Sequence, residues 1–367
     1  MSPSPLTVLH VDSARQYRGG QNQARLLMAG LAGRAGVRQA LVAGATSRLA
    51  REARDLGVHV HATPWRGAFD HRALRELCAR LAEDWDIVHA HDGHAVQSVL
   101  LARALSGGGS AVVAARRVDF PVRRLFVWRR ADLILGVSRR IRDVLVAQGI
   151  ERRRVEVVHS GIDPREIAAL SDGVSARELR AAAHVGDAQV LVAAVGALVG
   201  HKDHATLVRA AALLAPRHPD VRFAVFGDGP ERPVLERLVT EHGLDARFRL
   251  PGRFPDAARA LAGVDVFVMP SKEEGLGTAC IEAMLARRPV VATSAGGLGE
   301  LATDGAFRPV PPEDPAALAA ELEPLLADAN ARALAGAAAQ RGARRFTADA
   351  MVEGTLRGYR ALTASGR

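Results

Sequence analysis

Lysine, cysteine and aromatic residues are all scarce in this sequence of 367 residues. The only cysteines, Cys78 and Cys280, are too few for a disulfide framework or a cysteine-ligated zinc site, and such low content suits a reducing cytoplasm. The longest uninterrupted apolar run, residues 190–200, is too short to span a bilayer. Residues 1–5 lack the basic head of a signal peptide, so a cytoplasmic protein is expected.

Positive charge is carried almost entirely by arginine, because the only two lysines among the 49 basic residues are Lys202 and Lys272. Residues 1–160 hold 25 arginines against 14 acidic residues, whereas the remainder holds 24 basic and 26 acidic residues. A GC-rich coding bias accounts for arginine in place of lysine but not for this asymmetry. Aromatic residues make up 4% and no recognition motif is present, so no nucleic-acid partner is expected.

Short apolar runs alternate with amphipathic stretches along most of the chain, which predicts an α/β protein with parallel strands joined by helices. Residues 160–175 contain glycine and proline and are predicted to be a linker between two such series. The pattern is typical of two Rossmann-like domains that face each other across a ligand-binding cleft. The predicted strands are 6–11, 40–43, 87–90, 111–115, 133–137 and 155–158, then 190–195, 221–226, 248–250, 264–269 and 290–293.

The segment Pro270–Met284 carries the most informative pattern, because it follows a predicted buried strand. Gly275 and Gly277 would allow a ligand to approach the backbone, and a helix is predicted to open near Gly277. The free N–H groups and the dipole of a helix N-terminus favour a phosphate. Glu274 in the loop and Glu282 in the helix can point toward one site and bind sugar hydroxyls. The alternative is a solvated glutamate pair on an ordinary crossover.

Several segments, taken in order, resemble those of retaining glycosyltransferases of family 4, which have the GT-B fold. Glu274-Gly-Leu-Gly followed by Glu282-Ala resembles the family's E-x7-E signature. Gly19-Gly20 resembles its glycine-rich first loop, and His159-Ser-Gly-Ile-Asp163 resembles its N-G-V-D turn. Val195-Gly-Ala-Leu-Val-Gly-His-Lys-Asp203 resembles its G-R-L-x-x-x-K segment. Gly227-Asp-Gly-Pro230 resembles its G-x-G-P strand end, and Gly296-Gly-Leu-Gly-Glu300 resembles its G-G-x-x-E loop.

The resemblance implies a role for each matched residue. Lys202 would contact the donor diphosphate and neutralise charge on the leaving group. Glu274 would hold hydroxyls of the transferred sugar, and Glu282 would hold the ribose hydroxyls. Contacts to the donor through the backbone or by close approach are implied for Gly19, Gly20, Leu276, Gly277 and Thr278.

One position departs from the family pattern. The family usually has an arginine beside the second-domain glycine, where this chain has Ala197. One of the cations that would bind the donor diphosphate is therefore missing or is supplied by another residue. The candidates are Arg253, His201, His204 and an arginine of the basic half. Lys272 matches no family position and is predicted to be a solvated loop residue.

His91 follows the predicted strand 87–90, at the end where parallel sheets bind ligands, and the family commonly has a histidine here near the sugar. Together, His91, Lys202 and Glu274 form the predicted catalytic set. His89 and His94 lie close in sequence, but no cysteine or carboxylate set completes a metal site, and His89 can equally be structural. No metal or other cofactor is expected, because protein groups neutralise the phosphates in this family.

Arginine doublets with interleaved apolar residues run from Arg116 to Arg154. We place Arg116 and Arg117 on the acceptor side. The basic and aromatic residues would bind an anionic acceptor or anionic lipid headgroups at the inner face of the plasma membrane. A solvated arginine-rich face is the alternative.

Together with the resemblance, the sequence predicts a hexosyl- or related transferase that moves a sugar, with retention, from a nucleotide-diphosphate sugar to a hydroxyl of a glycan or lipid-linked acceptor. Bacterial envelope glycan or lipopolysaccharide assembly is the expected setting. Two alternatives remain, a nucleotide-sugar 2-epimerase of the same architecture and a catalytically dead sugar-nucleotide-binding protein. The predicted domains are 1–165 on the acceptor side and 166–345 on the donor side, with a helix at 346–367 packing back on the first.

Overall fold

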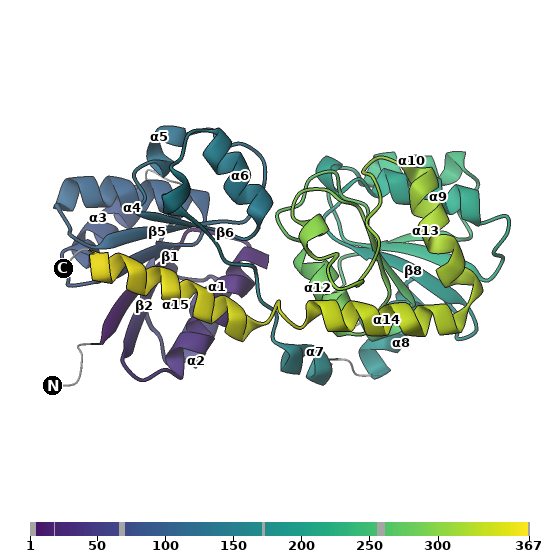
Figure 1. Cartoon of the computed structure of the whole chain (residues 1–367), viewed down its shortest axis with the longest axis horizontal. Coiled ribbons are helices and arrows are strands. Elements are labelled where there is room, and N and C mark those ends of the chain that lie inside the picture. The colour runs from purple at the N-terminus through teal and green to yellow at the C-terminus, as the bar shows by residue number, and fades with distance from the viewer. Residues whose placement is uncertain (1–4, 18, 66–69, 171–172, 255–260, 366–367) are drawn as a thin grey trace. The chain divides into compact units, whose positions relative to one another are not determined.

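The computed structural model describes residues 5–17, 19–65, 70–170, 173–254 and 261–365. Contacts divide the chain into unit 1, residues 1–161 with 348–367, and unit 2, residues 162–347 (Figure 1). The boundaries therefore fall after Gly161 and Thr347 rather than after residues 165 and 345. The reason is local, because Ile162 and Thr347 pair with each other in a parallel bridge and so belong to the same unit.

Unit 1 is built on a seven-stranded parallel sheet with the strand order β3-β2-β1-β4-β5-β6-β7. Each predicted strand of this half is present, but the edge strand β3 was not predicted. Its sequence His-Val-His-Ala-Thr lacks the apolar run that marks the buried strands. The strands are β1 (Leu6–Asp12), β2 (Val37–Gly44), β3 (His59–Thr63), β4 (Ile87–Ala90), β5 (Ala111–Arg116), β6 (Leu133–Gly136) and β7 (Val155–Val157).

Several helices of unit 1 begin directly after a side chain that accepts a hydrogen bond from the first turn, which is why they start where they do. These caps are Ser47, Asp70, Asp92 and Ser138. The helices are α1 (Gly19–Ala32), α2 (Arg48–Asp55), α3 (His71–Leu81), α4 (Gly93–Ser106), α5 (Leu125–Trp128), α6 (Arg139–Ala147) and α15 (Ala348–Ser365), with a 3-10 turn η1 at Arg152–Arg154.

The C-terminal helix α15 packs on unit 1 beside α1 (Figure 1). Its apolar side chains join one hydrophobic core with strands β1, β4, β5 and β6. The two helices approach closely at Gly30, where an added Cβ would lie 2.5 Å from a methyl carbon of Val352. Tyr359, fully buried, reaches the sheet from this helix.

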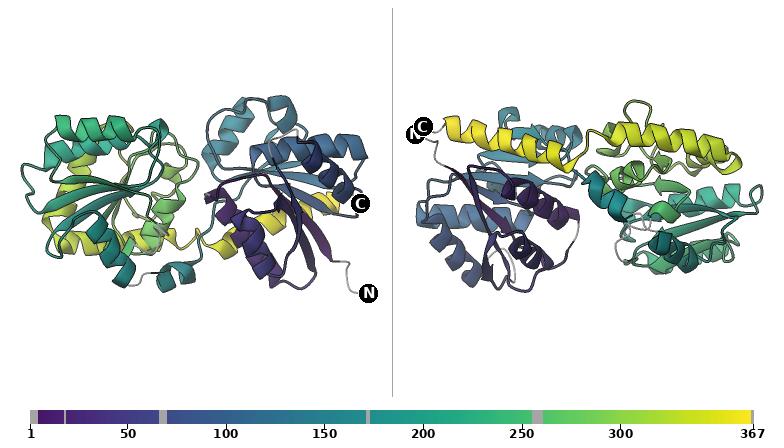
Figure 2. Two further views of the ribbon diagram at one scale, coloured as in Figure 1. Left: turned by 180° about the vertical axis from the view of Figure 1, so that it is seen from behind. Right: turned by 90° about the horizontal axis from the view of Figure 1, so that it is seen from below.

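Unit 2 is built on a five-stranded parallel sheet with the strand order β10-β9-β8-β11-β12, and helices cover both faces of each sheet (Figure 2). The strands are β8 (Val190–Val195), β9 (Val221–Phe226), β10 (Phe248–Gly252), β11 (Val266–Met269) and β12 (Val290–Ala292). The helices are α7 (Pro164–Leu170), α8 (Gly173–Ala182), α9 (His204–Leu214), α10 (Arg232–Glu241), α12 (Thr278–Leu285), α13 (Pro315–Ala327) and α14 (Ala329–Ala343), with 3-10 turns η2 (Gly200–Lys202), η3 (Leu261–Gly263) and η4 (Leu298–Glu300).

The boundary between the units falls inside the predicted linker at residues 160–175, but the segment is not a loop. It holds α7 and the start of α8, while residues 171 and 172 are outside the described chain. Pro164 is tolerated at the first position of α7, where a missing N–H costs nothing. The side chain of Asp163 accepts a hydrogen bond from the backbone N of Arg165 at 2.8 Å and so starts the helix. Proline and an acidic residue here therefore mark a helix start rather than a loop.

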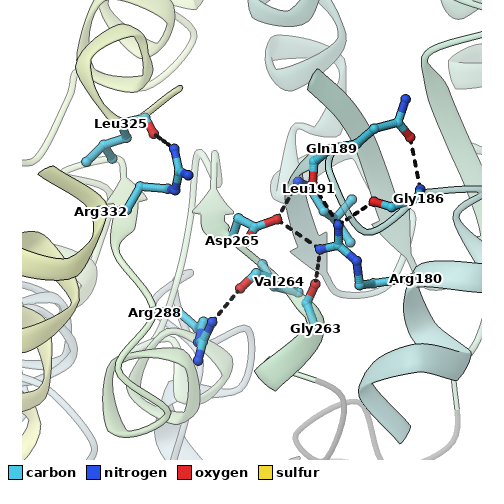
Figure 3. Close-up of polar contacts among 10 residues, drawn as sticks. All are labelled: Arg180, Gly186, Gln189, Leu191, Gly263, Val264, Asp265, Arg288, Leu325 and Arg332. Atoms are coloured by element: carbon cyan, nitrogen blue, oxygen red, sulfur yellow. Dashed lines mark hydrogen bonds and ion pairs between the residues drawn. The ribbon is translucent and has the colours of Figure 1, made fainter. Parts of the chain in front are cut away.

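Arg180 of α8 ties the beginning of unit 2 to its sheet (Figure 3). Its guanidinium donates to the carbonyl oxygens of Gly263 and Gly186 and to Asp265 Oδ2 at 2.8 to 3.0 Å. Asp265 Oδ2 also accepts a hydrogen bond from the backbone N of Leu191 at 2.8 Å. These contacts hold the N-terminal ends of β8 and β11. The loops that contain Lys202 and Glu274 follow the C-terminal ends of the same two strands.

The predicted α/β class and the two Rossmann-like halves are confirmed. Among the described residues, no helix has the length and apolar character needed to cross a membrane.

Candidate active-site residues in the two domains

Lys202 and Glu274 form an ion pair in unit 2. Lys202 ends η2 after strand β8, and Glu274 lies in the loop after β11, the next strand in the sheet. The side chains are 22% and 14% exposed, so the pair is largely shielded from water. The structure therefore brings together two of the three predicted catalytic residues at the carboxyl end of one sheet, where such sheets bind ligands.

Glycines let the loops around this pair pack against each other. The backbone N of Gly297 donates to Glu274 O at 2.8 Å, and a Cβ at Gly297 would lie 2.1 Å from Gly275 O. Gly277 has a φ of +89°, and its Cβ would meet Leu298 at 2.5 Å. Gly297 is required for loop packing and Gly277 for its backbone conformation and packing. A ligand opening, which was predicted at Gly277, is therefore not needed to explain that glycine.

Helix α12 begins beside Glu274 with Gly277 as its N-cap and Thr278 as its first residue. Within the described residues no side chain caps this helix, so its first N–H groups are available to an anion. Leu276, 2% exposed, anchors the loop in the core. The arrangement places a partial positive charge at the helix start, where an anionic group is favoured.

Glu282 lies in α12, and burial raises its pKa from 4.5 to about 7, with a smaller contribution from the negative charge of Glu166. Glu166 comes from α7, the helix that the sequence did not predict. At neutral pH the Glu282 carboxyl therefore exists in both forms and can either donate or accept a hydrogen bond.

Ala197 is exposed, and its carbonyl oxygen contacts His204 Nε2 at 3.3 Å. Burial lowers the pKa of His204 to about 4, so this histidine is neutral and does not replace the missing arginine. Arg253 is exposed, and its charge contributes to lowering the pKa of Asp228, which places it near the end of β9. Lys272 is exposed and forms an ion pair with Glu313 at 3.1 Å.

His91 lies in unit 1 directly after β4, with its ring almost fully buried. Its Nε2 is 3.0 Å from His10 Nδ1, and its ring centroid is 4.2 Å from that of His89. Burial lowers the pKa of His91 well below its usual value, and the neighbouring His89, His10 and Arg117 lower it further. His91 is therefore a neutral hydrogen-bonding group.

Arg117 lies beside His91 and the glycine-rich first loop. It donates to His91 O at 2.7 Å, and a Cβ at Gly20 would lie 3.7 Å from Arg117 Cδ. Gly19 and Gly20 begin helix α1. Arg116, the last residue of β5, instead places its guanidinium over the rings of Phe120 and Trp128. Burial lowers the pKa of Arg116 to about 10.

Two carboxylates at the same end of the sheet were missed in the sequence. Asp12 ends β1 and accepts hydrogen bonds from Gln21 Nε2 and the backbone N of Ala14, both at 3.0 Å. Asp92 follows β4 and binds both the backbone N and the Oγ of Ser13, at 2.7 and 2.6 Å. Burial raises the pKa of Asp12 to about 6, with a further contribution from Asp92. Their position directly after predicted strands was the available signal.

His10, His89 and His91 bring one ring nitrogen each within 4.8 Å of the others. This set differs from His89, His91 and His94 considered in the sequence, because His94 is exposed at the start of α4. Two of these rings contact each other directly, because His10 Nδ1 lies 3.0 Å from His91 Nε2. The absence of a metal remains a prediction.

Two family models of glycosyltransferases match the chain. Residues 17–166 match the model described as Glycosyltransferase Family 4, and residues 189–328 match the model described as Glycosyl transferases group 1. The two models fall on units 1 and 2 respectively. Each half of the chain therefore carries a glycosyltransferase domain.

Three curated relatives share part of the chain. The 2-deoxystreptamine glucosyltransferase of Streptomyces kanamyceticus is 42% identical over 106 residues, which cover 28% of this chain and 27% of that protein. The D-inositol 3-phosphate glycosyltransferase of Salinispora tropica is 37% identical over 191 residues, covering 48% and 39%. The lipopolysaccharide core biosynthesis glycosyltransferase LpsE of Rhizobium meliloti is 39% identical over 119 residues, covering 32% and 34%. The matches span less than half the length of these relatives.

Solved structures resemble the chain over nearly its whole length. HepE of Anabaena, solved with UDP and glucose, has a TM-score of 0.82 at 19% identity and covers 97% of this chain and 100% of its own. A glycosyltransferase from Rickettsia africae has a TM-score of 0.83 at 17% identity and covers 98% of both chains. At these identities the likeness shows the fold alone, which is that of GT-B proteins.

Proposed function

We propose that this chain, whose two halves are glycosyltransferase domains, transfers a sugar from a nucleotide-diphosphate sugar to a hydroxyl group of an acceptor. The observation that carries the proposal is the Lys202–Glu274 ion pair, which lies beside the uncapped N-terminus of α12. This arrangement offers a cation and free N–H groups to a diphosphate and a carboxylate to a sugar. UDP and glucose occur together in the structure of HepE, which has the same fold.

The proposed chemistry begins with an exchange of partners at Lys202. A donor diphosphate beside the α12 N-terminus replaces Glu274 as the anionic partner of Lys202, and the freed carboxylate accepts hydrogen bonds from hydroxyls of the sugar. As the bond from the sugar to the diphosphate breaks, negative charge grows on the leaving phosphate. Lys202 and the helix N-terminus are already in place to stabilise it, and such preorganised charge is a large term in group transfer. The reaction proposed here needs no metal ion.

Glu282 would hold the ribose hydroxyls, for which a carboxyl that can accept or donate at neutral pH is well suited. Retention of the anomeric configuration belongs to the same proposal and rests on the resemblance of Glu274 and Glu282 to the E-x7-E signature. His91 and Arg117 in unit 1 would contact the transferred sugar and the acceptor side.

We further place the reaction at the inner face of a bacterial plasma membrane, with a glycan or lipid-linked acceptor. Residues 116–140 hold eight arginines and only two aspartates. Within this segment Phe120 and Phe126 are 49% and 65% exposed. Exposed rings among arginines suit a surface of anionic lipid, into which the rings insert while the arginines meet the headgroups. The envelope setting is supported by the likeness to LpsE.

A panel of nucleoside diphosphates and nucleotide sugars tests the donor proposal. A true donor raises the midpoint of thermal unfolding by mass action. The donor found in this way should then be consumed with release of its nucleoside diphosphate and transfer of its sugar. A free sugar epimerised at C2, with no acceptor consumed, would support the epimerase alternative. Binding without turnover in the presence of acceptor extracts would support a catalytically dead protein.

Flotation with lipid vesicles tests the membrane proposal. The protein should float with vesicles of phosphatidylglycerol and phosphatidylcholine but not with phosphatidylcholine alone. Phe126→Ser should weaken flotation, whereas Leu334→Ser, which changes a 73% exposed residue of unit 2, should not. Equal binding to both kinds of vesicle would contradict the proposal that the protein binds an anionic membrane.

A further inference from the structure

Asp203 joins two helical segments of unit 2 with a backbone conformation that side chains rarely adopt. Its φ and ψ are 46° and 47°, in the left-handed region. The residue follows η2, which ends at Lys202, and it is the N-cap of helix α9. An N-cap residue normally has an extended backbone, so this connection is an exception that needs a cause.

The side chain of Asp203 suits this conformation and is held in place. Residues other than glycine are strained in the left-handed region, but aspartate and asparagine tolerate it better than most. Asp203 Oδ2 accepts a hydrogen bond from Thr206 Oγ1 at 2.7 Å. Both residues are buried, at 8% and 2% exposed. A buried carboxylate needs such a donor, so the bond holds Asp203 against the first turn of α9.

Main-chain hydrogen bonds connect the conformation of Asp203 to Lys202. Asp203 N donates to Gly200 O at 3.3 Å. Lys202 N donates to Val199 O at 3.0 Å, and these two bonds close η2. On the other side, Thr206 N donates to Asp203 O at 3.1 Å. Because residue 203 takes part in both turns, a change in its backbone would alter the turn that contains Lys202.

The same turn sets the course of the Lys202 side chain. A Cβ added at Gly196, directly after β8, would lie 4.0 Å from Lys202 Cδ, so the stem of the lysine runs beside this glycine. Its ammonium then pairs with Glu274. His201 O accepts a hydrogen bond from Lys272 N at 2.8 Å, which joins η2 to the loop that carries Glu274. This connection is made by the main chain and therefore does not depend on the ion pair.

We propose that Asp203 is a positioning residue that keeps Lys202 directed at the donor diphosphate, through its left-handed backbone and its bond to Thr206. The proposal rests on the proposed function, in which Lys202 stabilises the leaving phosphate. A lysine is a point charge on a flexible stem, so a fixed backbone reduces the number of directions in which that charge can point. A charge already in place needs no reorganisation when the bond breaks. Asp203 acts through Lys202 and not on the donor.

Hydrogen exchange of the full-length protein tests the structural part of the proposal without turnover. The peptide of residues 199–204 contains the amides that close η2, and Asp203→Ala should raise its exchange about tenfold. Asp203→Asn tolerates the left-handed backbone and keeps an acceptor for Thr206, so it should exchange like the wild type. Asp304→Ala is the matched control, because Asp304 is an exposed aspartate of unit 2 with a φ of +54°. It should leave the exchange of this peptide unchanged, whereas unchanged exchange in Asp203→Ala would overturn the proposal.

Once a donor is known, a double-mutant cycle tests whether Asp203 acts through Lys202. Asp203→Ala should lower kcat/KM about tenfold, and Asp203→Asn should restore it to within about twofold of the wild type. In a Lys202→Ala background, Asp203→Ala should cause no further loss. A further tenfold loss in that background would overturn the proposal, because Asp203 would then act on unit 2 in general.

A second variant keeps the test available if Asp203→Ala does not fold. Thr206→Val removes the same hydrogen bond while residue 203 stays unchanged, and its smaller loss of kcat/KM should also vanish in the Lys202→Ala background. Loss of the same size in both backgrounds would contradict the positioning role. Failure of the proposed function would look different, because the wild type itself would then bind no nucleoside diphosphate and consume no donor.

Discussion

Lys202, in the turn after β8, and Glu274, in the loop after the neighbouring strand β11, are partners in an ion pair in unit 2. Each residue therefore has its charge satisfied by the other, and both are largely shielded. A buried pair that gives up one partner leaves an uncompensated charge, unless a new partner arrives at the same time. A nucleotide-diphosphate sugar provides both partners, an anion for Lys202 and hydroxyl donors for Glu274.

Glu274→Gln should separate binding of the nucleotide from transfer of the sugar. Loss of the carboxylate frees Lys202, so a nucleoside diphosphate without a sugar should bind several-fold more tightly. Transfer should fall by about a hundredfold or more, because the charged contact to the sugar is lost. Titration calorimetry and a transfer assay measure the two effects. Weaker binding of the nucleoside diphosphate would show that Glu274 does not compete for Lys202.

Ala197→Arg should strengthen donor binding, because it introduces the cation that this chain lacks at an exposed position. An added charge-assisted contact to a phosphate corresponds to roughly a tenfold gain in affinity. Ala197→Gln, of similar length but uncharged, is the control. If both variants bind the donor like the wild type, the diphosphate does not lie beside Ala197.

Stability should fall as the pH rises through the range in which Glu282 ionises. Its pKa is raised from 4.5 to about 7 in the folded protein, so the folded state binds the proton more tightly than the unfolded state. Linkage then predicts a loss of up to about 3 kcal/mol of folding free energy between roughly pH 4.5 and 7. Glu282→Gln should flatten this part of the profile in urea unfolding of unit 2. An equally steep profile in the variant would contradict the assignment.

Asp12 should likewise make unit 1 less stable as the pH rises, because burial raises the pKa of its carboxyl to about 6. The two effects are separable, since Asp12→Asn acts on the other domain. A fluorescent probe in each domain would therefore report which carboxyl controls which transition.

Tyr359→Phe should loosen the attachment of α15 to unit 1. The Tyr359 hydroxyl lies 2.6 Å from His89 Nδ1, and both side chains are buried. Removing the hydroxyl leaves a ring nitrogen without a partner, which costs about 1–3 kcal/mol. Urea unfolding measures this loss. Tyr17→Phe serves as the control, because its hydroxyl makes a long 3.4 Å contact with Asn22 in a half-buried setting.

Most of the fold was predictable because buried parallel strands are apolar runs with clear breaks between them. The exceptions have physical reasons. The edge strand β3 contains two histidines and little apolar surface, and α7 begins at a proline that also fits a loop. Both are cases in which neighbouring structure, rather than local pattern, decides the conformation.

The candidate site was predictable only where single residues match a motif. Lys202 and Glu274 were expected in one site, and the structure pairs them. The contacts made by Gln39, His10, Asp12 and Tyr359 were not expected, because these residues lie on three different elements, β1, β2 and α15. Their contacts depend on the strand order and on the return of α15, which no local pattern reveals. The role of His204 was also misjudged, since its burial becomes visible only in the folded chain.

The most direct test of the donor site compares the only two lysines of the chain in one assay of sugar transfer from the identified donor. Lys202→Ala should lower kcat/KM by about a hundredfold or more, because one preorganised charge on the leaving group is lost. Lys272→Ala removes an exposed lysine paired with Glu313 and should leave kcat/KM within about twofold of the wild type. Equal activity of Lys202→Ala and wild type would contradict the account.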